Sequence, residues 1–80
     1  MNAQINQQVR DVIVKAFDLP PQVAQGELRM GSVPRWDSMG HMELVIRLED
    51  EFQVSFPAYA LADLVDVDSI VRAIEEQKAQ

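Results

Sequence analysis

The sequence predicts an all-α protein, a four-helix bundle with a long loop between its first two helices and a short third helix. Three observations support this. Apolar residues recur at three- and four-residue steps in several segments, as on one face of a helix. Prolines follow these segments and stop the helices from continuing. No segment alternates apolar and polar residues in the way that is typical of a strand.

The first helix is predicted at about residues 3–17, and Asp18 with the pair Pro20-Pro21 ends it. Its apolar stripe consists of Ile5, Val9, Val12, Ile13, Ala16 and Phe17. About 20 residues then separate it from the second helix, which is long for a loop in a small domain. This loop is expected to pack onto the bundle through its own apolar residues, Leu19, Val23, Leu28, Met30, Val33 and Trp36.

The second helix is predicted at about residues 38–53, and Pro57 prevents it from extending further. It is amphipathic, because polar residues cover most of the surface outside an apolar stripe of Leu44, Val45, Leu48 and Phe52. His41 lies one step before this stripe, and we expect it to be an ordinary histidine at the edge of the core.

A short third helix is predicted at about 58–65 and a last helix at about 68–79, with Asp68 as its N-cap. The residues expected to face inward from the third helix are Leu61, Leu64 and Val65. Those expected on the apolar side of the last helix are Ile70, Val71, Ala73 and Ile74. Together the elements form a single domain over residues 1–80.

The composition of the chain excludes several classes of function. The chain has 80 residues, and 48% of them are hydrophobic, which is enough for a folded domain. Its formal net charge of -6 repels the phosphate backbone of nucleic acids. Nucleic-acid binding is therefore not expected, whereas partners with basic patches are favoured. No apolar run approaches the roughly 18 residues of a membrane span. The N-terminus lacks the features of a signal peptide, and cysteine is absent. We therefore expect a cytoplasmic protein.

The segment with the clearest chemistry surrounds Ser38, where the loop becomes the second helix. A helix start offers free N–H groups and the positive end of the dipole, which suits a phosphate ester. The local alternative is that Asp37 or Ser38 only caps the helix. A reciprocal capping acid is missing, because Gly40 and His41 occupy the positions where it would stand.

The triplet Asp37-Ser38-Met39 is followed by Glu43-Leu44-Val45, by Leu48-Glu49-Asp50-Glu51-Phe52 and by Phe56-Pro57. With this spacing the chain resembles the acyl carrier protein family, whose hallmark is Asp-Ser-Leu before an acidic amphipathic helix. The resemblance extends over nearly the whole chain, because the long loop and the outer helices also fit.

The resemblance implies that a phosphopantetheinyl transferase moves 4'-phosphopantetheine from coenzyme A onto Ser38, with Asp37 and Met39 as its neighbours. The chain would then carry acyl groups as thioesters without catalysing a reaction or binding a metal itself. Its partners would be acyl-loading and acyl-processing enzymes with basic docking patches, and it would act as a monomer. The helix face that such partners read corresponds to Met39, Glu43, Ile46, Glu49 and Asp50.

Charge independently favours such partners. Residues 37–51 hold five acids and one arginine, which places -4 of the formal -6 around one helix. A patch of this kind accelerates encounters with basic surfaces, most strongly at low salt.

Three departures from the family pattern favour a specialised, stand-alone carrier over the housekeeping one of fatty-acid synthesis. Met39 replaces leucine, Val33-Pro34-Arg35-Trp36 replaces a lead-in with Leu-Gly, and Arg47 interrupts the acidic face, where it can pair with Glu43 or Glu51. Trp36 is expected to pack under the loop.

The cargo stays open between fatty-acyl, polyketide and related acyl groups. An aminoacyl or peptidyl carrier and an unmodified acidic helical adaptor are the alternatives.

Two other classes do not fit. Ser38-x-Gly40 half resembles a hydrolase nucleophile elbow, but Trp36 occupies the place of the first glycine. The run Asp66-Val67-Asp68 begins like a calcium-binding EF-hand loop, yet the sixth position is Val71 and not glycine.

Overall fold

The computed structural model describes residues 3–79 and confirms the all-α prediction. Three α-helices, α1 (Ala3–Phe17), α2 (Ser38–Phe52) and α3 (Val67–Ala79), are joined by segments that contain two 3-10 helices, η1 (Pro21–Val23) and η2 (Ala58–Asp63). Within the described residues the extended chain forms isolated bridges and no strand.

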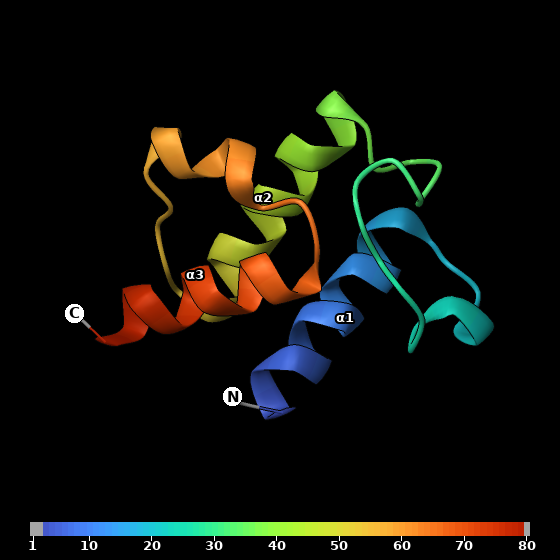
Figure 1. Ribbon diagram of the computed structural model, residues 1–80, viewed down its shortest axis with the longest axis horizontal. Coiled ribbons are helices and arrows are strands. Elements are labelled where there is room, and N and C mark those ends of the chain that lie inside the picture. The colour runs from blue at the N-terminus through green and yellow to red at the C-terminus, as the bar shows by residue number, and fades with distance from the viewer. Residues whose placement is uncertain (1–2, 80) are drawn as a thin grey trace.

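Helix α1 packs against both α2 and α3, while η2 connects the end of α2 to the start of α3 (Figure 1). The long loop between α1 and α2 lies at the side of the bundle away from both termini (Figure 1). One core joins the three α-helices and the loop. Its buried apolar residues are Val9, Val12, Ile13, Ala16, Phe17, Leu28, Val33, Trp36, Leu44, Val45, Leu48, Phe52, Phe56, Leu64, Val67, Ile70, Val71 and Ile74.

The long loop is fixed by packing and by hydrogen bonds. The Arg10 guanidinium donates from Nη1 to the carbonyl oxygens of Ala24, at 3.1 Å, and Gly26, at 2.6 Å. Further along, Met30 N–H donates to Val65 O at 2.8 Å and ties the loop to the segment before α3. The prediction that Val23 helps to pack the loop is wrong, since it is exposed at the end of η1.

The C-terminal end of α2 is closed by both backbone and side chain. Gln53 adopts the left-handed conformation, with φ 54°, and its N–H donates to Glu49 O. The Glu49 carboxylate also accepts a hydrogen bond from Phe56 N–H, with Oε2 at 2.8 Å from N. These contacts turn the chain out of the helix and lead Phe56 back into the core.

The third element is shorter than the sequence predicts and is a 3-10 helix that ends at Asp63. Leu64 is buried as expected and Leu61 packs against the core, but Val65 is exposed and not inward-facing. The reason is that the chain leaves helical geometry at Leu64, with φ -86° and ψ 67°, and Val65 continues as the extended partner of the loop.

Helix α3 begins at Val67, one residue before the predicted start, so the prediction that Asp68 caps it is wrong. Asp66 takes this position. Its Oδ1 accepts from Ser69 N–H at 2.8 Å, and Ser69 Oγ accepts from Asp66 N–H at 3.1 Å. This reciprocal pair satisfies two backbone donors at the helix start. The earlier start also buries Val67 in the core.

Among residues 3–79, no helix is both long and apolar enough to cross a membrane.

Candidate functional site

Ser38 is the first residue of α2 and is exposed. Asp37, which precedes it with extended backbone, is the N-cap, because its Oδ1 accepts from Gly40 N–H at 2.9 Å. Of the two candidate caps Asp37 therefore does the capping. Within the part of the chain that the structure describes, no hydrogen bond engages the Ser38 hydroxyl, which points to a serine that is available for chemistry.

Gly40 allows α2 to begin close against the preceding loop. A Cβ at this position would overlap the Arg35 carbonyl oxygen and would lie 3.0 Å from Phe17 Cε1. Both neighbours belong to the packed junction of α1, the loop and α2, and one of them is backbone. The glycine is therefore required by this close approach, whatever else lies beside Ser38.

Trp36 and His41 form a buried hydrogen-bond chain beneath the start of α2. Trp36 Nε1 donates to His41 Nδ1 at 3.0 Å, and His41 Nε2 lies 2.8 Å from Leu61 O in η2. Because the indole N–H can only donate, Nδ1 is the acceptor and the proton sits on Nε2, which donates to the carbonyl. The prediction that Trp36 packs under the loop is confirmed, since it is 1% exposed and stacks on Phe17.

The prediction that His41 is an ordinary boundary histidine is wrong. It is buried, and its two ring nitrogens connect Trp36, at the end of the long loop, to Leu61 in η2. Its position one step before the apolar stripe of α2 was the available clue. The partners could not be found from the sequence, because Leu61 contributes a backbone oxygen 20 residues away.

Four of the five predicted docking residues are exposed on α2, and the fifth, Glu49, is half-buried. Met39 is 85% exposed and Ile46 64% exposed, and Met42 lies between them at 48%. The sequence prediction did not include Met42. These three exposed apolar side chains all lie within residues 38–46 of α2, which begins at Ser38.

The acids on this helix are less available than their number suggests. Glu43 pairs with Arg47, with 3.6 Å between its Oε1 and Nη2, as the four-residue spacing predicts. The half-buried Glu49 is engaged with Phe56 N–H. Asp50 is exposed and presents its carboxylate to solvent. Arg47 therefore offsets the charge of Glu43, whereas Glu49 keeps its negative charge but is held at the end of α2, and Asp50 is exposed.

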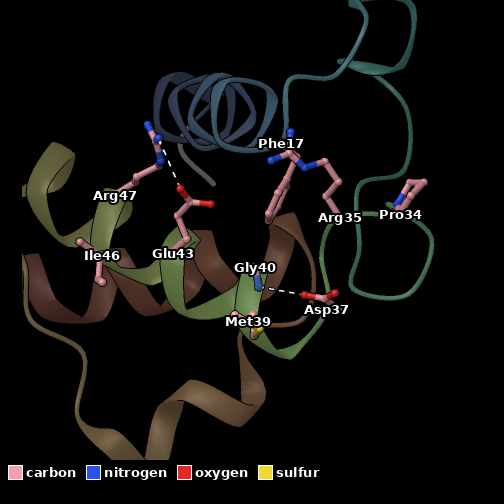
Figure 2. A pocket seen from close by; sticks show the side chains of 9 residues that line it. All are labelled: Phe17, Pro34, Arg35, Asp37, Met39, Gly40, Glu43, Ile46 and Arg47. Atoms are coloured by element: carbon pink, nitrogen blue, oxygen red, sulfur yellow. Dashed lines mark hydrogen bonds and ion pairs between the residues drawn. The ribbon is translucent and has the colours of Figure 1, made fainter.

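A hollow of about 810 Å³ lies beside the helix start, between the end of α1, the loop and α2 (Figure 2). Its lining residues are Phe17, Pro34, Arg35, Asp37, Met39, Gly40, Glu43, Ile46 and Arg47. The neighbours of Ser38 on both sides belong to this lining. No group of acids and histidines in residues 3–79 is arranged to hold a metal ion.

Curated relatives match most of the chain. An acyl carrier protein of Campylobacter concisus is 34% identical over 85% of this chain and 88% of its own length. Another of Campylobacter curvus is 31% identical over the same shares, and acyl carrier protein 3 of Ralstonia nicotianae is 30% identical over 92% of this chain and 85% of its own. The chain belongs to the acyl carrier protein family. No family model matches it, and no solved structure matches it significantly.

Membership in the acyl carrier protein family rests on nearly full-length likeness and not on a short motif around one serine. Within that family fold, two features of this chain were not apparent from its sequence. One is the buried Trp36–His41 pair, and the other is the hollow to which Phe17 and Arg35 contribute from outside α2. Trp36 and His41 are only five residues apart, but their burial also depends on Leu61 and Phe17, which are distant in the sequence, and periodicity gives no indication of such contacts.

Proposed function

We propose that this chain is a carrier whose Ser38 accepts 4'-phosphopantetheine and which presents acyl groups to biosynthetic enzymes. The observation that carries the proposal is the exposed Ser38 hydroxyl at the start of α2, which the helix does not use for capping. When bound, the arm's terminal thiol supplies the thioester linkage that holds the acyl group.

The residues present fit a phosphodiester at this position. Ser38 stands in the first turn of α2, where free backbone N–H groups and the helix dipole favour negative charge. Asp37 engages one carboxylate oxygen in the cap, which reduces its repulsion of a phosphate at the next residue. The exposure of Ser38 leaves room for a transferase to reach it.

His41 is not a general base for the modification of Ser38. This residue, the single histidine of the chain, is buried with both ring nitrogens engaged, so it cannot accept the serine proton. In the proposed reaction the Ser38 oxygen forms a bond to the pantetheine-bearing phosphorus of coenzyme A. The phosphoanhydride bond breaks, adenosine 3',5'-bisphosphate leaves, and a base of the transferase takes the serine proton. The carrier is thus a substrate and not a catalyst.

Partner recognition is proposed to combine the apolar surface of Met39 and Ile46 with the charge of Asp50. Removal of exposed apolar side chains from water supplies affinity, while the acid orients and accelerates the encounter. This surface suits the transferase and acyl-processing enzymes that present an apolar pocket beside basic residues. The departures from the family pattern favour a specialised acyl or polyketide pathway.

Modification is tested by intact-mass spectrometry after incubation with coenzyme A, magnesium and a broad-specificity phosphopantetheinyl transferase. The proposal predicts a gain of one phosphopantetheine group per chain. Absence of a gain in folded protein, alongside a carrier that the same transferase does modify, would contradict it and favour an unmodified adaptor domain.

The docking face is tested with Asp50→Lys, because Glu49 has a structural bond that a substitution there would also break. We expect the second-order rate of modification by a basic-faced transferase to fall at low salt and to recover part of the loss at high salt. Glu76→Lys, an identical charge change at an exposed position on α3, is the matched control. Equal rates for the two variants would exclude Asp50 from docking.

A further inference from the structure

The methionines of the described chain differ in how far their side chains reach into solvent. Met39 is 85% exposed and Met42 48% exposed, and both lie in the first half of α2. Met30, on the long loop, is half-buried and packs against the core. A peroxide must reach the sulfur atom to oxidise it, so exposure decides which methionine reacts first. Among residues 3–79, Met39 is therefore the methionine most open to oxidation.

Met39 lies where a chemical change alters the surface of the protein but not its interior. It directly follows Ser38 in the first turn of α2 and lines the hollow beside the helix start (Figure 2). It does not belong to the hydrophobic core or to the residues packed against that core. Oxidation to the sulfoxide would place a polar S–O group in solvent without removing a core contact. The fold would therefore persist while the surface next to Ser38 becomes polar.

We propose that Met39 is a redox modification site, where oxidation to the sulfoxide by a peroxide weakens the docking of partner enzymes at the start of α2. The sulfur lone pair forms a bond to one oxygen of hydrogen peroxide, and the O–O bond breaks. The second oxygen takes up the proton of the first and leaves as water. Sulfur is oxidised and the peroxide is reduced, so no other reactant is required. The inference rests on the proposed function, in which partners remove Met39 from water.

The size of the effect follows from the burial of this side chain against a partner. Removing a whole methionine side chain from water contributes enough free energy for about a tenfold or larger gain in a rate or equilibrium constant. A sulfoxide loses this gain, because its polar oxygen must give up water to enter an apolar pocket. Oxidation should therefore slow the modification of Ser38 by at least about tenfold. Sulfoxide reductases reverse the reaction, so the site can act as a switch.

The test begins with treatment of the whole folded protein with hydrogen peroxide, after which catalase removes the excess. Peptide mapping by mass spectrometry then measures the sulfoxide at each methionine, and we expect Met39 to be oxidised before Met30. The second-order rate of modification is measured with coenzyme A, magnesium and a broad-specificity transferase, and far-UV circular dichroism verifies the fold. We expect a rate at least about tenfold lower, which recovers after treatment with methionine sulfoxide reductases and dithiothreitol.

Met39→Leu is the informative variant, because leucine has a similar volume and no thioether. Met42→Leu, the same change at a less exposed position on α2, is its matched control. Peroxide should leave the rate of the first variant unchanged and should slow the second as it slows the unaltered protein. The proposal is overturned if Met30 is oxidised as fast as Met39, if oxidation leaves the rate of the unaltered protein unchanged, or if Met39→Leu loses as much rate. An untreated protein that gains no phosphopantetheine contradicts the attachment to Ser38 instead, so the two failures are distinguishable.

Discussion

The buried hydrogen bond between Trp36 and His41 allows a quantitative test of how the start of α2 is held. In His41→Leu the Trp36 indole N–H would remain buried with no acceptor, because the residue is 1% exposed and donates to Nδ1 at 3.0 Å. An orphaned buried donor costs about 1–3 kcal/mol. The carbonyl of Leu61 would also lose its partner, but it is only partly buried and water can replace it.

We therefore expect His41→Leu to lower the free energy of unfolding by about 2–3 kcal/mol. In a domain of this size, each kcal/mol corresponds to a melting temperature lower by about 4–8 °C. Trp36→Phe should also destabilise the protein, since it removes the donor and part of a large core side chain. In the double variant neither the indole N–H nor the imidazole remains. Its loss of unfolding free energy should therefore be smaller than the sum of the two single losses by about 1–2 kcal/mol.

The assay is urea unfolding followed by far-UV circular dichroism. Tryptophan fluorescence is unsuitable, because Trp36 is the single tryptophan of the chain and one variant removes it. The double-mutant cycle refutes the reasoning if the two losses add to within about 0.5 kcal/mol, which is the behaviour of independent sites. It would then follow that the indole and imidazole do not depend on each other.

Further predictions concern the close contacts and caps. Gly40→Ala should destabilise the protein by about 1–3 kcal/mol because its Cβ overlaps backbone, whereas Gly26→Ala, whose Cβ meets only an ordinary contact at 3.5 Å, should be neutral or slightly stabilising in the same urea assay. Glu49→Ala should cost about 1–2 kcal/mol through the lost bond to the N–H after α2, and Glu51→Ala less than about 0.5 kcal/mol; equal losses would contradict the cap. Hydrogen bonds from the serine at the start of α3, first from its backbone and then from its side chain, lower the pKa of Asp66 from the ordinary 3.8. The unfolded chain therefore binds the proton more tightly, and this contribution to stability is complete above about pH 4 and is lost as pH falls toward the folded pKa. Asp66→Asn should flatten the fall in stability below pH 4, as measured by urea unfolding across pH, and an unchanged slope would exclude this carboxylate as its source.

Helix periodicity was sufficient to predict the all-α class and the apolar stripes of α1, α2 and α3, because burial of a helix face repeats every three to four residues. Errors arose where a single backbone turn decides orientation. Val65 was expected inside, but the chain leaves the 3-10 helix at Leu64 and turns it outward. Asp68 was likewise expected to cap the last helix, but the aspartate that accepts from Ser69 N–H is Asp66.

The candidate site was predictable in its residues but not in their interactions. The sequence marked Ser38, and it could not show that Asp37 alone caps the helix and leaves the hydroxyl free. The spacing offered Arg47 two partners, Glu43 and Glu51, and the structure pairs it with Glu43, while the bond from Phe56 N–H to Glu49 had no signal in the sequence. Such differences come from contacts that only the folded chain creates.

The central claim is that the hydroxyl of Ser38 is the point of attachment, and side-chain replacement tests it most directly. Ser38→Ala should unfold at nearly the same urea concentration as the unaltered protein, because Asp37 and not Ser38 caps α2. After incubation with coenzyme A, magnesium and transferase, intact-mass spectrometry should show no added phosphopantetheine in this variant and one group in Ser32→Ala, a control at an exposed serine in the preceding loop. A phosphopantetheine group on folded Ser38→Ala would contradict the account.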